Sequence, residues 1–258
     1  CKKLQVQGIP AQLLTPLQAD EDRVLLFLHG GGYVYGSLKS HEGMVAEIAR
    51  ASTCAALQLD YRLAPEHPFP AAVEDACAAY KWLLAQGFSA GKISLVGDSA
   101  GGGLVVAAML ALREQGLPLP GAAACISPWV DLEATGASYE LRKHKDPMVE
   151  RKVVELVAGL YLNGQDAKQP TASPLHADLR GLPPLLIQVG ENEILFSDAQ
   201  MLALKARAAG LDVQFEEWPG MVHVWHSYYP ILTDARRAIV RIGAYLLEKT
   251  RAGMAQPC

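Results

Sequence analysis

Short runs of apolar residues recur along the chain and are separated by longer segments with helical spacing. A strand-length run that is apolar throughout is typical of a strand buried on both faces of a sheet. The runs that predict such strands are 24–28 (VLLFL), 55–59 (AALQL), 92–96 (KISLV), 122–126 (AAACI) and 184–189 (PLLIQV). Residues 213–218 (VQFEEW) alternate between apolar and polar, which predicts a strand nearer the edge. Residues 3–7 and 11–14 predict a hairpin.

Amphipathic or wholly apolar segments of helical length lie between these strands. The predicted helices are 41–52, 70–86, 100–115, 197–209 and 231–249. Gly87, Gly116 and Gly210 stand where three of them end, as expected for helix stops. Alternation of strands and helices predicts an α/β fold in one domain over 1–258, with a mostly parallel central sheet flanked by helices.

One region interrupts this alternation. Residues 133–172 lie between two predicted strands and are longer than a crossover helix requires. Within them, 146–162 (DPMVERKVVELVAGLYL) predicts a helix with Asp146 as its cap and Pro147 in its first turn. We expect this insertion to form a small helical cap over the sheet.

Composition excludes several classes of protein. Half of the 258 residues are hydrophobic, enough to form a large buried core. The net charge of −4 argues against a nucleic-acid or anionic-membrane partner. No apolar run is long enough to span a membrane. The five cysteines (Cys1, Cys54, Cys77, Cys125 and Cys258) are odd in number and form no CxxC pair. This usage argues against a disulfide framework or a zinc site and fits a cytoplasmic protein.

Ser99 lies in the sequence VGDSAGGG, at the junction of a predicted strand and a predicted helix. The G-x-S-x-G pattern at such a junction is typical of a nucleophile elbow. Gly97 and Gly101 are then required because side chains at these positions would collide across the tight turn. The alternative is that Ser99 only caps the helix. We favour the nucleophile, because both flanking elements are present.

A second glycine-rich segment, FLHGGGYVYGS (27–37), follows the predicted strand 24–28. Successive glycines leave backbone N–H groups free to point into a site, as in an oxyanion hole. The N–H of the residue after the nucleophile supplies the other part of such a hole. The sequence therefore predicts oxyanion donors at Gly30, Gly31 and Ala100.

A nucleophilic serine needs a histidine base and an acid that orients it. His223 follows the predicted strand 213–218 through a short loop, and we favour it over His226, which starts the next helical region. The acid is expected after strand 184–189, where Glu193 is favoured over Asp198. Asp198 has a sufficient structural role in the first turn of the helix 197–209. The histidine pair has no accompanying ligand cluster, so no metal is expected.

Four segments together carry a family resemblance. The segments are HGGGYVYGS, DYRLAPEHPFPAAVED, VGDSAGGG and GMVHVWH. They resemble the hormone-sensitive-lipase-like group (family IV) of microbial carboxylesterases, within the α/β-hydrolase fold, over residues 23–249. The resemblance implies Ser99 as nucleophile, His223 as base and a helical cap built partly from 133–172.

The chain departs from this group in two ways. Many members carry an aspartate in a D-P-L context where this sequence has Glu193 in ENEIL. The stretch before His29 is short for the group, so a more open acyl pocket is expected.

The sequence thus predicts a serine carboxylesterase that hydrolyses short-chain esters through an acyl-enzyme and needs no cofactor. An amidase or a lactonase with the same triad is the alternative, and a non-catalytic small-ligand receptor is a third hypothesis. The apolar edge strand and the final helix are compatible with a homodimer.

Overall fold

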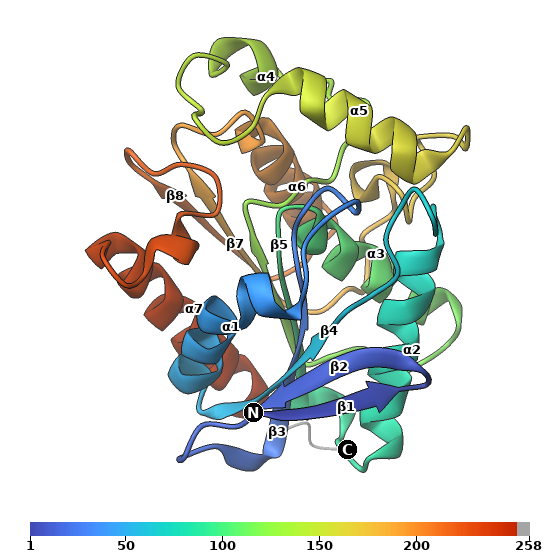
Figure 1. Cartoon of the computed structure of the whole chain (residues 1–258), viewed down its shortest axis with the longest axis vertical. Helices are drawn as coiled ribbons and strands as arrows, with labels where there is room; N and C mark the ends of the chain where they lie inside the picture. The colour runs from blue at the N-terminus through green and yellow to red at the C-terminus, as the bar shows by residue number, and fades with distance from the viewer. Residues whose placement is uncertain (252–258) are drawn as a thin grey trace.

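The computed structural model describes residues 1–251 and has one eight-stranded sheet at its centre (Figure 1). The strands lie in the order β1-β2-β4-β3-β5-β6-β7-β8. Their bounds are β1 Lys2–Val6, β2 Ile9–Leu14, β3 Asp20–Leu28, β4 Cys54–Leu59, β5 Ile93–Asp98, β6 Ala122–Ile126, β7 Leu185–Gly190 and β8 Val213–Trp218. From β4 through β8 all neighbours are parallel, while β1 and β2 join as an antiparallel hairpin beside β4.

Helices cover both faces of this sheet, as the alternation of elements predicts. The helices α1 (Leu38–Ser52) and α7 (Thr233–Arg251) share one face, where Phe27 and Ile126 belong to the same apolar cluster. The other face carries α2 (Ala71–Ala85), α3 (Ala100–Glu114) and α6 (Phe196–Ala208). Burial on both faces explains why the inner strands are apolar throughout.

The expected strands and long helices are all present, with ends shifted by a few residues. The largest shift among the five main helices is at α1, which begins at Leu38 rather than at 41. Ser37 caps it and forms a capping box with Ser40, a polar start that the apolar spacing could not show. β8 is the outer strand of the parallel part, as its alternating pattern indicates.

The insertion contains two helices, α4 (Ser138–Leu141) and α5 (Arg151–Leu162), and α5 crosses above the ends of the strands in Figure 1. The predicted start of the second helix was wrong, because α5 begins at Arg151 and not at Pro147. The carboxylate of Asp146 instead accepts hydrogen bonds from the N–H groups of Met148 and Val149 and from that of Ile194. Asp146 therefore closes a turn and ties the insertion to the segment after β7.

Cys1, Cys54, Cys77 and Cys125 are free thiols, and Cys258 lies outside the described residues. Among residues 1–251, no helix has both the length and the apolarity needed to cross a membrane. Three 3₁₀ turns complete the fold of residues 1–251: η1 (Ala90–Lys92), η2 (Pro174–His176) and η3 (Trp225–Tyr228).

Candidate active site

The residues singled out from the sequence meet at the carboxyl ends of the parallel strands, where ligands bind in open α/β sheets. Ser99 follows β5, and His223 lies in the loop after β8. Both line a cavity of about 360 Å³, together with Gly30 and Gly31 of the loop after β3. Apolar side chains of the insertion close its other side: Met148, Val149, Val153, Val154 and Val157.

The turn at Ser99 has the strained geometry of an elbow. Its backbone has φ 54° and ψ −122°, outside the conformations that a non-glycine residue adopts readily. A Cβ on Gly97 would overlap the backbone of Gly101, and a Cβ on Gly101 would overlap the carbonyl oxygen of Leu28. The Ser99 side chain makes no capping hydrogen bond to α3. The glycines are thus steric requirements, and the hydroxyl is left to face the cavity.

Glu193 and His223 form the central side-chain pair of the site. His223 Nδ1 lies 2.9 Å from Glu193 Oε2. The other oxygen, Glu193 Oε1, accepts hydrogen bonds from Ser127 Oγ at 2.7 Å and from the Gly190 N–H at 2.6 Å. Glu193 is fully buried. Three donors therefore fix the carboxylate, which in turn fixes the imidazole ring.

The same contacts set the charge balance of His223. Burial by itself would lower the pKa of this imidazole, but the hydrogen bond and the negative charge of Glu193 raise the pKa above the ordinary histidine value. If Nδ1–H donates to Glu193, the neutral ring leaves Nε2 free to accept a proton. Among the described residues no hydrogen bond joins Ser99 Oγ to His223. Such bonds are often long in structures without substrate.

Asp198, the alternative acid, serves another part of the molecule. Its Oδ2 accepts hydrogen bonds from the N–H groups of Val130 and Asp131, each at 3.0 Å. Burial raises the pKa of this carboxyl to about 8 in spite of those two bonds. Asp198 therefore holds the loop after β6, and Glu193 is the acid that contacts His223.

His226, the alternative base, is buried in a network of its own. Its Nε2 lies 2.7 Å from Gln188 Oε1, and the Gln188 amide donates to Glu216 Oε2 at 2.8 Å. Burial lowers the pKa of His226 to about 3, so the ring is neutral at physiological pH. His226 is absent from the cavity lining that contains Ser99. We therefore give it a structural role.

The glycine loop corrects one predicted oxyanion donor. The Gly30 N–H donates to Asp98 Oδ1 at 3.0 Å, so it is engaged and does not serve a bound oxyanion in this conformation. Among the described residues, the N–H groups of Gly31, Gly32 and Ala100 have no protein acceptor. Gly32 has φ +60° and lines the same cavity. The prediction of Gly30 was wrong because the sequence cannot show that Asp98 accepts its N–H, whereas Gly31 and Ala100 remain candidate donors and Gly32 joins them.

His29 fixes this loop and is not exposed to the cavity. Its Nδ1 lies 2.8 Å from the Gly30 carbonyl oxygen, and its ring stacks on Tyr61 with the ring centres 4.3 Å apart. The Tyr61 hydroxyl donates to the His29 carbonyl at 2.6 Å. The proline-rich segment after β4 thereby supports the loop from behind.

Three further polar residues of the site, Ser127, His41 and Asp98, were not identified from the sequence. Ser127 directly follows β6, and its Oγ also accepts from the Val224 N–H at 3.2 Å, next to His223. His41 Nε2 lies 3.4 Å from Asp98 Oδ2. A polar residue at the carboxyl end of a buried strand is a signal that could have found Ser127 and Asp98.

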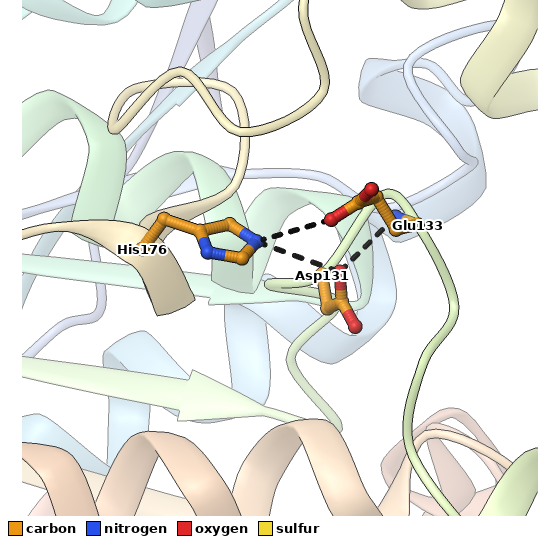
Figure 2. A group of neighbouring side chains, drawn as sticks. All are labelled: Asp131, Glu133 and His176. Atoms are coloured by element: carbon orange, nitrogen blue, oxygen red, sulfur yellow. Dashed lines mark hydrogen bonds and ion pairs between the residues drawn. The ribbon is translucent and has the colours of Figure 1, made fainter.

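One group of potential metal ligands lies elsewhere. Figure 2 shows His176 pointing toward Asp131 and Glu133, at 4.0 Å and 3.6 Å from their carboxylates. The Asp131 carboxylate already accepts hydrogen bonds from the N–H groups of Glu133 and Thr135. These bonds give the cluster a structural explanation as a turn with a neighbouring histidine.

Comparison with known proteins agrees with this geometry. Residues 25–227 match a family model described as the α/β hydrolase fold. An acetyl-hydrolase from Streptomyces hygroscopicus is 51% identical over 244 residues, which cover 95% of this chain and 81% of that protein.

Solved structures give the same result. An esterase of the bacterial hormone-sensitive lipase family is 53% identical, with a TM-score of 0.95, over 96% of this chain and 84% of that one. The esterase EstE5, in a crystal soaked with p-nitrophenyl butyrate, is 50% identical with a TM-score of 0.95, over 97% and 84%. The chain therefore belongs to the α/β hydrolase fold family, among the carboxylic ester hydrolases of the hormone-sensitive lipase group.

Proposed function

We propose that the chain hydrolyses short-chain carboxylic esters through an acyl-enzyme formed on Ser99. The observation that carries this proposal is the strained turn that presents the Ser99 hydroxyl to the cavity lined by His223, whose ring Glu193 holds at 2.9 Å. A serine in such a turn is a poor nucleophile until a base takes its proton. His223 Nε2 is the proposed base and Glu193 the proposed orienting acid.

The reaction then follows from the positions of these groups. Ser99 Oγ attacks the ester carbonyl while His223 Nε2 takes the hydroxyl proton, and the C–O bond to the alcohol breaks as His223 returns that proton to the leaving oxygen. Water, activated by the same histidine, releases the acid. The oxyanion of each tetrahedral intermediate would accept hydrogen bonds from the N–H groups of Gly31, Gly32 and Ala100. The helix α3, whose N-terminus points at the same place, adds partial positive charge.

The size and lining of the cavity support short acyl chains. Its volume of about 360 Å³ is small for a ligand site, and α5 closes it with valine side chains. We propose that residues 133–172 act as a cap over the acyl site. The names of similar proteins agree, since one is an acetyl-hydrolase and another was soaked with a butyrate ester.

Two other activities use the same residues. An amidase or a lactonase would need the same nucleophile, base and acid, so a substrate panel has to include amides and lactones. A receptor without turnover would not need the Glu193–His223 pair, whose geometry favours catalysis.

The remaining expectations concern the setting of the enzyme. We propose a reducing, cytoplasmic location because Cys54, Cys77 and Cys125 are buried free thiols. We also propose a homodimer formed by the outer strand β8 and the helix α7 beside it. Light scattering of the purified chain measures its mass and tests the dimer directly.

The experiment compares the wild-type chain with Ser99→Ala on p-nitrophenyl esters of increasing acyl length. We expect turnover to be highest for acetate and butyrate, and to fall in the variant by about 10⁶. Tight binding of an ester without turnover by the wild-type chain would instead favour the receptor. Hydrolysis that is undiminished in Ser99→Ala would refute the assignment of the nucleophile.

A further inference from the structure

The cavity contains a second carboxylate–imidazole pair besides Glu193–His223. Asp98, the residue before Ser99, is 2% exposed, and its Oδ2 lies 3.4 Å from His41 Nε2. His41 belongs to α1, and its side chain is 15% exposed where it lines the cavity. The reaction proposed above uses neither residue.

Asp98 connects this pair to the oxyanion loop. Its Oδ1 accepts the Gly30 N–H at 3.0 Å, and a Cβ on Gly30 would overlap its Oδ2. The loop backbone therefore packs directly against the carboxylate. Burial alone would raise the pKa of Asp98, but His41 and the Gly30 N–H lower it, so Asp98 is a buried anion beside the nucleophile.

His41 is held from its other side by the start of α1. Its Nδ1 lies 2.8 Å from Ser40 Oγ, and Ser40 forms the capping box with Ser37. Two ionisable side chains lie close to the His41 ring: Asp98 at the end of β5 and His29 directly after β3. The centres of the His41 and His29 rings are 5.4 Å apart. Burial would lower the pKa of His41, but Asp98 raises it above the ordinary value.

We propose that His41 is a positioning residue: it balances the charge of Asp98, so that the N–H groups of the oxyanion loop can stabilise the negative charge on the substrate oxygen. This inference rests on the proposed esterase function. The negative charge that develops on the substrate oxygen lies near Asp98, because the N–H groups that would stabilise it follow Gly30 directly. An imidazolium at position 41 cancels the repulsion between these two negative charges, and a neutral ring does not.

The proposal fixes the direction of the pH dependence. As pH rises through the pKa of His41, the imidazolium loses its proton and Asp98 is left uncompensated, so kcat falls at alkaline pH. Asp98 also favours the protonated form of His223. Removing the positive charge at His41 therefore raises the pKa of His223 and moves the acid limb of the pH–rate profile to higher pH.

The test is His41→Gln, whose amide can still donate a hydrogen bond to Asp98 but carries no charge. We expect kcat for p-nitrophenyl butyrate at neutral pH to fall about tenfold, the order expected of one uncompensated charge near an oxyanion. KM should change little, the alkaline limb of the wild-type profile should disappear, and the acid limb should move to higher pH. His176→Gln, which removes a partly exposed histidine that does not line the cavity, is the matched control and should leave the profile unchanged.

A second variant separates charge from structure. Asp98→Asn keeps a carbonyl oxygen for the Gly30 N–H and removes the negative charge that His41 balances. In that background the added His41→Gln change should alter kcat by less than about twofold. The cycle remains informative even where a single variant is less stable, because the effect of His41→Gln on kcat is measured within the Asp98→Asn background.

The outcomes distinguish this inference from the proposed function. A wild-type chain without esterase activity would contradict the proposed function itself. An active wild type whose pH profile is the same in His41→Gln, or a His41→Gln loss that is equally large in the Asp98→Asn background, would overturn only the role of His41.

Discussion

The substitution Glu193→Gln changes one oxygen for an NH₂ group and leaves the size of the side chain almost unchanged. The amide oxygen can occupy only one of the two carboxylate positions. At the Oε1 position it accepts from Ser127 Oγ and the Gly190 N–H, which lie at 2.7 and 2.6 Å. The NH₂ group then faces His223 Nδ1, which lies 2.9 Å from Oε2 in the native pair.

This orientation determines the tautomer of His223. Flipping the amide would set its NH₂ against the Gly190 N–H and take away the acceptor of Ser127, and each unmade buried bond costs about 1–3 kcal/mol. The unflipped amide requires His223 to accept at Nδ1, so that its proton moves to Nε2. A protonated Nε2 cannot accept the proton of Ser99. In serine proteases the equivalent change lowers kcat by about 10⁴, which corresponds to about 5 kcal/mol.

The assay is kcat for p-nitrophenyl butyrate, with Asp198→Asn as the matched control. The pKa of Asp198 is raised to about 8, so its carboxyl is mostly neutral at pH 7. An asparagine keeps an oxygen for the two backbone donors, and we expect activity within a few-fold of wild type. A loss in Asp198→Asn larger than that in Glu193→Gln would refute the assignment of the acid.

Three other outcomes follow from the same structure. Gly101→Ala should lower the free energy of unfolding by about 3 kcal/mol or more, because the added Cβ overlaps a backbone oxygen. Gly159→Ala, which has open space around it in α5, should raise the free energy of unfolding by up to about 1 kcal/mol. Urea titration of both variants checks this difference, and equal effects would contradict it. The acid limb of kcat/KM should lie above the ordinary histidine pKa of 6.5, because the pKa of His223 is raised and only its neutral form accepts a proton; a limb below 6.5 is the contrary result. The neutral, buried His226 takes up a proton on unfolding, so the free energy of unfolding should fall as pH drops from 6.5 toward about 3, by up to about 1.4 kcal/mol per pH unit. Denaturation at several pH values measures this dependence, and the change in unfolding free energy per pH unit should be smaller in His226→Gln.

The main elements could be predicted because each follows from a local pattern. Fully apolar runs mark buried parallel strands, and the strand–serine–helix junction marks the elbow at Ser99. Gly97 and Gly101 could be read as steric requirements because the tight turn demands them whatever surrounds it. The choice of Glu193 over Asp198 came from its place in the loop, and its contact with His223 agrees with that choice.

The features that were missed depend on contacts between distant segments. Gly30 is not available as an oxyanion donor, because its N–H donates to Asp98, which is 68 residues away in sequence. Asp146 does not cap α5, which begins at Arg151, and its carboxylate also accepts the N–H of Ile194, 48 residues away. The His41–Asp98 pair joins a helix to the end of another strand. Periodicity and short motifs describe neighbours along the chain, so they contain no information about such pairs.

Direct labelling of the nucleophile tests the central claim, that Ser99 forms a covalent intermediate with the acyl group. A p-nitrophenyl alkylphosphonate reacts as an ester would but leaves an adduct that water does not readily release. The wild-type chain should release one equivalent of p-nitrophenol, lose its esterase activity, and carry the phosphonyl group on Ser99 in peptide mass spectrometry. An adduct on any other residue, or full inactivation with Ser99 unmodified, would contradict the account.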